Sequence, residues 1–94
     1  MAYGETNNHP APPHRLTLDE RRKLEVAGVE EVVSFHEEEV VVRTVKGLLI
    51  VRGEGLKVEK LEKESGELTV SGLVSELLYE TERTASGFLA RLFR

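Results

Sequence analysis

The chain has 94 residues, a formal net charge of −4, a sequence pI of about 5.4 and no cysteine. Its length suits one domain. The acidic balance argues against broad nucleic-acid binding, which needs a basic surface, and the lack of cysteine excludes disulfides and thiolate zinc sites. No run approaches the roughly 18 consecutive apolar residues that span a bilayer, and the polar N-terminus lacks the apolar core of a secretory signal. We therefore expect a cytoplasmic protein, and its small core favours self-association.

The first residues have the composition of a disordered segment. Residues 1–15 contain all three prolines, Gly4, Asn7 and Asn8, and show no apolar periodicity. Such segments cannot bury enough apolar surface to become ordered. We predict a disordered arm over residues 1–15, either a frayed terminus or a binding arm, followed by a β domain over residues 16–82.

The β domain is predicted from short apolar runs separated by turn residues. Residues 16–23 are interpreted as an extended approach to the first strand. β-branched side chains fit a pleated sheet, and glycine takes the positive φ of tight turns without steric cost. The runs lie at 23–26, 30–35, 39–45, 48–52, 56–61 and 68–71, with turns at Gly28, 36–38, 46–47, 53–55 and 65–66.

These runs predict an all-β fold, mainly antiparallel, in the form of a small sandwich or a rolled sheet with a short C-terminal helix. Parallel crossovers are disfavoured, because no segment between the runs is long enough for a connecting helix. The similar texture of GEGLKVEKL (53–61) and SGELTVSGL (65–73) leaves a short β-solenoid-like stack as the alternative.

Two details of the pattern carry further predictions. Val40, Val41 and Val42 are consecutive, so a strand through them is apolar on both faces and needs cover from a second sheet or another copy of the chain. We therefore expect a homo-oligomer, most simply a dimer. After Gly72 the apolar positions change from even to odd numbers, which indicates a β-bulge at that glycine.

The C-terminal segment has a different period. Residues 83–94 place apolar side chains at helical spacing, which predicts a short amphipathic helix that is too short to persist alone in water. It either packs on its own sheet or docks on a protein partner or an anionic membrane surface. The candidate partner-binding residues of this tail are Phe88, Leu89, Arg91, Leu92, Phe93 and Arg94.

No pattern in the sequence predicts catalysis, a metal or a cofactor. His9 and His14 fall in the predicted arm and His36 in a turn, where ligands do not converge. The neighbouring carboxylates 37–39 alternate in direction along an extended chain and are interpreted as a solvated loop. The glycines around Glu54 lack the phosphate-loop pattern. We expect a non-enzymatic protein.

From Lys23 onward the chain resembles the YabP family of sporulation proteins, including its YqfC-like members. Each matching segment is short, and their order and spacing carry the likeness; the last one resembles the YabP ending more than the YqfC one. The segments are LEVAGV (24–29), VSF (33–35), TVKGLL (44–49), GEGL (53–56), GELTVSG (66–72), LLY (77–79) and GFLARLFR (87–94).

The resemblance implies a role in spore formation in an endospore-forming bacterium. Members of the family are expected in the mother cell, late, when cortex and coat form around the forespore. This implies an assembly or interaction module at the forespore surface, with a membrane-associated sporulation protein as the partner; the alternative is a regulator that binds a signalling or envelope protein. The resemblance assigns no catalytic residue and no cofactor.

Overall fold

The computed structural model of the protein describes residues 13–81, so the predicted tail at 83–94 and most of the predicted arm lie outside the described residues. Six strands form one antiparallel sheet in the order β2-β3-β7-β6-β5-β4. The strands are β2 (Arg15–Asp19), β3 (Lys23–Ala27), β4 (Val29–Phe35), β5 (Glu39–Thr44), β6 (Gly47–Glu62) and β7 (Glu67–Glu80).

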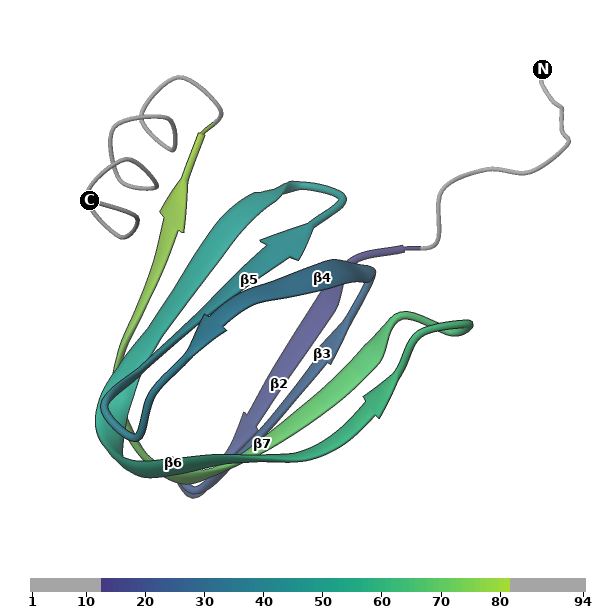
Figure 1. Ribbon diagram of the computed structural model, residues 1–94. Helices are drawn as coiled ribbons and strands as arrows, with labels where there is room; N and C mark the ends of the chain where they lie inside the picture. The colour runs from purple at the N-terminus through teal and green to yellow at the C-terminus, as the bar shows by residue number, and fades with distance from the viewer. Residues whose placement is uncertain (1–12, 82–94) are drawn as a thin grey trace, which may run out of the picture.

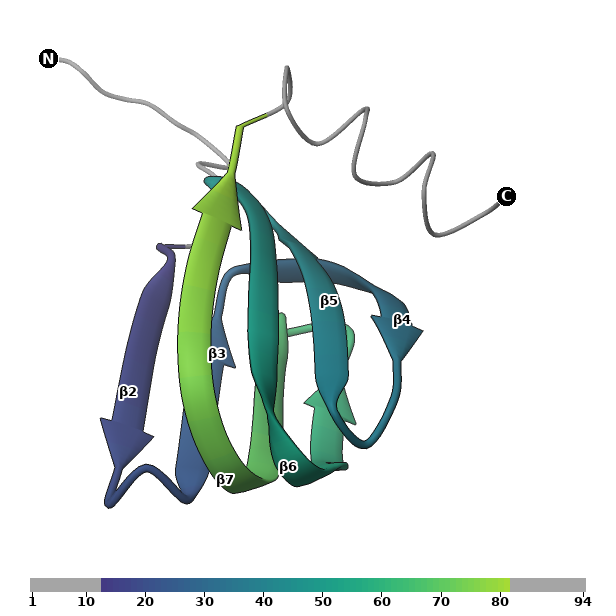
Figure 2. The same ribbon diagram turned by 90° about the vertical axis from the view of Figure 1, so that its left-hand side faces the viewer.

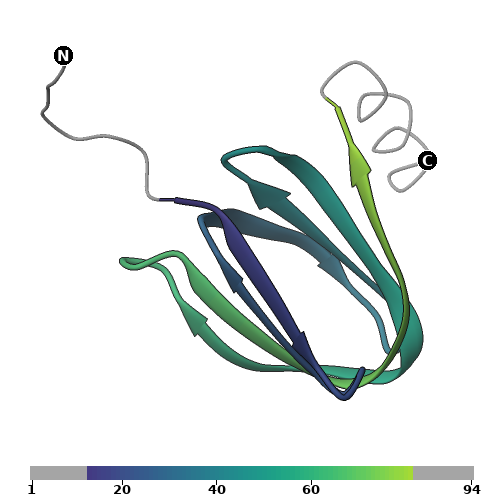
Figure 3. The same ribbon diagram turned by 180° about the vertical axis from the view of Figure 1, so that it is seen from behind.

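The sheet is rolled, because the two longest strands bend sharply (Figure 1). β6 and β7 pair along most of their length, and each carries a hairpin on a different part. The β2–β3 hairpin pairs with residues 68–71 of β7, and the β4–β5 hairpin pairs with residues 47–52 of β6. We call these parts the first and the second half-sheet. Seen from behind, the two half-sheets face each other across the interior (Figure 3).

Glycines make the bend in β6 and β7. A Cβ atom on Gly53 would lie 1.9 Å from the carbonyl oxygen of Leu73 on the neighbouring strand. A Cβ on Gly72, which has a φ of +122°, would lie 2.5 Å from the carbonyl oxygen of Gly55. The two strands therefore approach closely at the bend only because these side chains are missing.

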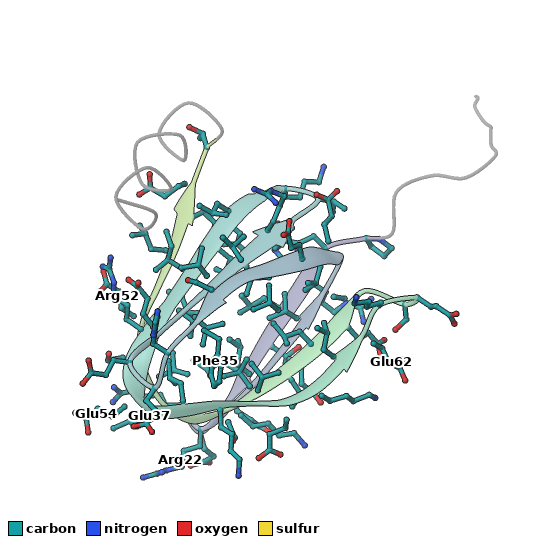
Figure 4. All side chains as sticks on the ribbon, viewed as in Figure 1. Arg22, Phe35, Glu37, Arg52, Glu54 and Glu62 are labelled. Atoms are coloured by element: carbon teal, nitrogen blue, oxygen red, sulfur yellow. The ribbon has the colours of Figure 1, made fainter. Side chains whose placement is uncertain are left out.

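The interior between the half-sheets is filled by valine and leucine side chains from five strands, with Leu16 and Leu18 of β2 at its margin. Figure 4 shows side chains filling this space, with Phe35 near its opening. Alternation along each strand puts these residues on one face. The buried members are Leu24, Val26, Val29, Val40, Val42, Leu49, Val51, Leu56, Leu68, Val70 and Val74.

Hydrogen bonds tie the open sides of the roll at their ends. On the side bordered by β4, the Val29 N–H at the start of β4 donates to the Gly66 carbonyl at 2.9 Å. Beyond the other end of β4, the Leu56 N–H donates to the Glu37 carbonyl at 2.8 Å. On the other side, the Val74 N–H donates to the Arg21 carbonyl at 2.8 Å. These bonds hold the half-sheets together at the ends of β4 and at the β2–β3 turn.

The predicted all-β, mainly antiparallel fold is confirmed, and the rolled sheet is the form it takes among residues 13–81. The alternative of a stacked solenoid is wrong for this region, because every strand pairing in it is antiparallel. Residues 16–23 are not an approach but most of a hairpin, and residues 53–55 bend β6 without ending it. The predicted change of apolar phase occurs at Ser75 rather than Gly72, because Gly53 pairs with Val74 while Arg52 pairs with Glu76.

Candidate interaction surface

The second half-sheet is apolar on both faces. Besides the interior cluster, a second buried cluster lies on the outward side of β4, β5, β6 and β7, and we call it the outer apolar face. Figure 2 views the molecule from this side, with β7, β6 and β5 in front. The outer apolar face consists of Val41, Leu48 and Ile50, with the partly buried Val33 and Leu78 packed against them.

The register explains why this face is continuous. Val41 pairs with Ile50, and Ile50 pairs with Leu78, so three strands contribute apolar side chains to one row. Directly paired residues in a sheet lie on the same face and in contact. Val41 and Ile50 are 0% exposed and Leu48 is 4% exposed. Val41 and Ile50 are therefore fully removed from water, although they lie outside the rolled interior.

The outward side of the first half-sheet is polar instead. Its cross-strand row runs from Thr17 through Glu25 to Thr69 and on to Lys60. Thr69, close in size to valine and flanked by long charged side chains, stays partly exposed, and Glu25 is exposed. A shallow pocket of about 200 Å³ on this side has both acidic and basic residues in its lining, which gives no preference for one class of ligand. This side is an ordinary solvated sheet surface.

Ser34 marks the border of the outer apolar face. It lies on β4, an edge strand of the sheet, and pairs with Val41. Its hydroxyl oxygen is buried and has no hydrogen-bond partner among the described residues. A hydroxyl on the outward side of an edge strand normally reaches water, and leaving it buried and unpaired costs about 1–3 kcal/mol. The burial of this atom indicates that the outer apolar face is covered.

Ion pairs surround the outer apolar face. The Arg52 guanidinium donates to Glu39 at 3.0 Å and to Glu76 at 3.3 Å, and Arg43 pairs with Glu31. The hydrogen bonds to Glu39 and Glu76 raise the pKa of Arg52 above its ordinary value. Figure 4 shows Arg52 on the outside of the molecule. Such exposed pairs contribute less than about 1 kcal/mol each, so they set the polar rim rather than the stability of the face.

Among residues 13–81, three large apolar side chains stay exposed at the open edges of the roll. Phe35 is 45%, Leu61 41% and Tyr79 46% exposed. The Tyr79 ring lies edge-on to that of His14, with centroids 5.6 Å apart. His14 Nδ1 donates to the Ala27 carbonyl at 2.8 Å, which leaves Nε2 to accept from the Tyr79 hydroxyl. His14, which the sequence pattern places in the arm, thus joins the start of β2 to the end of β7.

The site residues predicted from the sequence, Phe88, Leu89, Arg91, Leu92, Phe93 and Arg94, lie outside the described residues. The outer apolar face was missed as a site. Its one sequence signal was the run Val40, Val41 and Val42, whose predicted burial on both faces is confirmed by exposures of 0%. Among residues 13–81, no group of three or more His, Cys, Asp or Glu side chains is placed to hold a metal ion.

These features define a class of protein: a small all-β domain on one rolled antiparallel sheet, half of which is apolar on both faces. Within the part of the chain that the structure describes, no helix is long and apolar enough to cross a membrane. The model of the YabP family matches residues 10–86, and the chain belongs to this family. It is 38% identical to the Spore protein YabP of Bacillus subtilis (strain 168) over 98% of this chain and 96% of that protein. The resemblance seen in the sequence is thereby confirmed.

Proposed function

We propose that this protein is a non-enzymatic sporulation protein that acts in the mother cell, at the cortex and coat stage, as an assembly or interaction module at the forespore surface. Support for a role in spore formation comes from membership of the YabP family and from the likeness to a protein named as a spore protein. The stage, the compartment and the assembly role are parts of the proposal.

One structural observation supports an interaction module: the second half-sheet is apolar on both faces. An antiparallel sheet in a small domain commonly packs one face on the core and leaves the other to water, as the first half-sheet does here. A sheet that is apolar on both sides is a middle layer, and it needs a further polypeptide layer on its outward side. In the proposal, this third layer carries the contact with the partner.

The partner contact in this proposal lies in the basic end of the tail. Arg91 and Arg94 are the last charged residues, and no acidic residue follows Glu82. On a helix they lie on the side opposite the stripe of Phe88 and Phe93, so both sides are usable at once. We propose that the two arginines contact an acidic protein surface or anionic lipid headgroups, with a membrane-associated sporulation protein as the partner. Self-association is part of the proposal.

A fluorescent fusion of the full chain, imaged in sporulating cells, tests this function. We expect a signal at the forespore surface on the mother-cell side, and a diffuse signal for the charge reversal Arg91→Glu with Arg94→Glu. The matched control is Arg22→Glu with Lys23→Glu, which changes the charge by the same amount at an exposed turn of the sheet. The control is expected to localise like the wild type.

Capture of co-purifying proteins from the same cells separates the two roles. Recovery of coat or forespore-membrane proteins supports an assembly module, whereas recovery of a signalling protein or an envelope enzyme supports a regulator. A fusion that fills the forespore instead of surrounding it, or a tail variant that localises like the control, contradicts the proposal.

A further inference from the structure

We infer that the outer apolar face is the docking site of the chain's own C-terminal segment, residues 83–94, which packs Phe88, Leu89, Leu92 and Phe93 against Val41, Ile50 and their neighbours. The inference concerns the same face as the proposed function, but it does not use the role in spore formation. Its test uses the purified chain, so the two proposals can fail separately.

The burial of the face requires a cover. Val41 and Ile50 are 0% exposed, whereas Thr69, which occupies an equivalent central position on the outward side of the other half-sheet, keeps part of its surface in water. Both positions have long charged side chains nearby, so those side chains do not account for the difference. The buried, unpaired hydroxyl of Ser34 shows the same cover at the edge strand.

Strands β2 to β7 do not supply this cover. Each strand pairs with its neighbours in one sheet, and in the view of Figure 2 no strand lies in front of the outward side of β5, β6 and β7. The remaining parts of the chain are residues 1–12 and 82–94. Residues 1–12 contain one large apolar side chain besides Met1, that of Tyr3, together with two prolines. Residues 82–94 contain two phenylalanines and two leucines at helical spacing, which matches an apolar row of valine, leucine and isoleucine.

The lengths and the connection also fit. Glu80 ends β7 within the second half-sheet, and Leu78, two residues before it, belongs to the outer apolar face. The tail therefore starts at the border of the face. A helix over residues 86–94 is about 13 Å long at 1.5 Å per residue. From β4 to β7 there are three strand spacings, together about 14 Å. One short helix is thus long enough to cross the whole apolar row.

The polar groups agree with this orientation. With the apolar stripe on the sheet, Arg91 and Arg94 point to the opposite side of the helix, because successive residues turn by about 100°. Glu80, at the end of β7, lies on the same side of the strand as Leu78 and so adds a carboxylate to the rim of the face. The tail then forms the third layer that the second half-sheet needs, and its two arginines are held at the surface.

One residue makes the inference directly measurable. Ile50 is the single isoleucine of the chain, so a sample with labelled isoleucine δ1 methyl groups gives one methyl signal, and that signal reports on the outer apolar face. We expect nuclear Overhauser contacts from this methyl group to the ring protons of Phe88 or Phe93 in the full-length protein. We also expect an upfield methyl shift from the ring currents. Both are lost in Phe88→Leu with Phe93→Leu, which keeps apolar volume and so preserves the fold.

The control is Phe35→Leu, which makes the same change at an exposed position on the interior side and should leave the Ile50 signal unchanged. Three outcomes overturn the inference: a folded chain without contacts from Ile50 to either tail phenylalanine, contacts from Ile50 to Tyr3 instead, or contacts that appear only between differently labelled copies. A signal that is independent of protein concentration and lost only in the tail variant supports it.

Discussion

Replacing Gly53 by alanine tests whether the bend in β6 and β7 depends on the missing side chain. The φ of Gly53 is not in the left-handed region, so alanine meets no backbone penalty there. The cost is steric, because the new Cβ would lie 1.9 Å from the Leu73 carbonyl oxygen and 2.9 Å from its carbonyl carbon. The atom that must move belongs to the backbone of a paired strand, so the bend itself has to open.

Gly55→Ala is the matched control, two residues further along the same strand. Its Cβ would meet nothing within 4 Å, but its φ is +61°. Alanine there pays only the left-handed penalty of about 1–2 kcal/mol. For Gly53→Ala we expect a loss of about 3 kcal/mol or more, the upper end of the range for overpacking, because the neighbour cannot rotate away.

Thermal unfolding followed by circular dichroism measures the difference. A change of 1 kcal/mol shifts the Tm of a domain of this size by about 4–8 °C. We therefore expect Gly53→Ala to melt at least about 4 °C below Gly55→Ala, taking the smallest difference of about 1 kcal/mol at the smaller sensitivity. Equal melting temperatures, or a Gly53→Ala variant as stable as the wild type, would refute the view that close strand approach at Gly53 shapes the sheet.

Three further substitutions test other parts of the fold. The Thr44 hydroxyl donates to the Gly47 carbonyl at 2.7 Å and accepts from the Lys46 N–H at 3.0 Å. Thr44→Val should therefore lower the free energy of unfolding, measured with urea, by about 1–3 kcal/mol, whereas Thr44→Ser should retain most of the stability. Burial raises the pKa of the Tyr79 phenol above its ordinary value. As the pH rises above about 10, the unfolded chain loses this proton before the folded chain does, so the stability falls. Tyr79→Phe should make this fall smaller in thermal melts at increasing pH. Glu20 has a φ of 52° in the β2–β3 turn, a conformation that asparagine adopts more readily than glutamate. Glu20→Asn should therefore raise the free energy of unfolding by up to about 1 kcal/mol, and no gain would mean that the turn is not strained at Glu20.

The strands that the sequence predicts best are those with β-branched runs. The pairing of β5 with β6 follows from apolar segments on either side of a predicted turn at residues 46–47, and the structure has this hairpin with its turn one residue earlier, at Val45 and Lys46. The burial of Val40, Val41 and Val42 was also predictable, because three consecutive apolar residues in a strand must face both sides of a sheet. Local chemistry decides these features, so a local pattern is enough to find them.

Features that depend on distant contacts were not predictable. β2 was interpreted as an approach segment, because its hairpin turn uses Glu20 and Arg21 at positive φ instead of the usual glycine or asparagine. That turn is held from outside, since Arg21 bonds to Val74 through both its carbonyl and its guanidinium group, and Val74 is 53 residues away. The link from His14 to Tyr79 spans 65 residues and has no local signal either.

The candidate site shows the same division. The apolar stripe of the tail was visible in the sequence from the spacing of Phe88, Leu89, Leu92 and Phe93. The surface that matches it was not, because the row of Val41, Ile50 and Leu78 comes from three strands and exists only in their register. A sequence pattern can show that a segment needs an apolar partner, but the sheet topology is needed to show where that partner lies.

The two half-sheets differ on their outward sides, and this difference bears on self-association. The expected homo-oligomer was motivated by Val41 needing cover, with a second copy of the chain as one source of it. If the tail covers Val41 and Ile50, that motive disappears, and a dimer must form through free strand edges such as those of β2 and β4. These edges resist pairing, since β4 has two register irregularities and β2 begins with Arg15 and ends with Asp19. Tail docking and a dimer through the outer apolar face therefore exclude each other. Two measurements decide between them: light scattering over a range of protein concentrations, and the Ile50 methyl signal in the same samples. Docking of the tail requires a methyl signal that stays constant upon dilution. A dimer through this face requires the methyl signal to change as the copies separate.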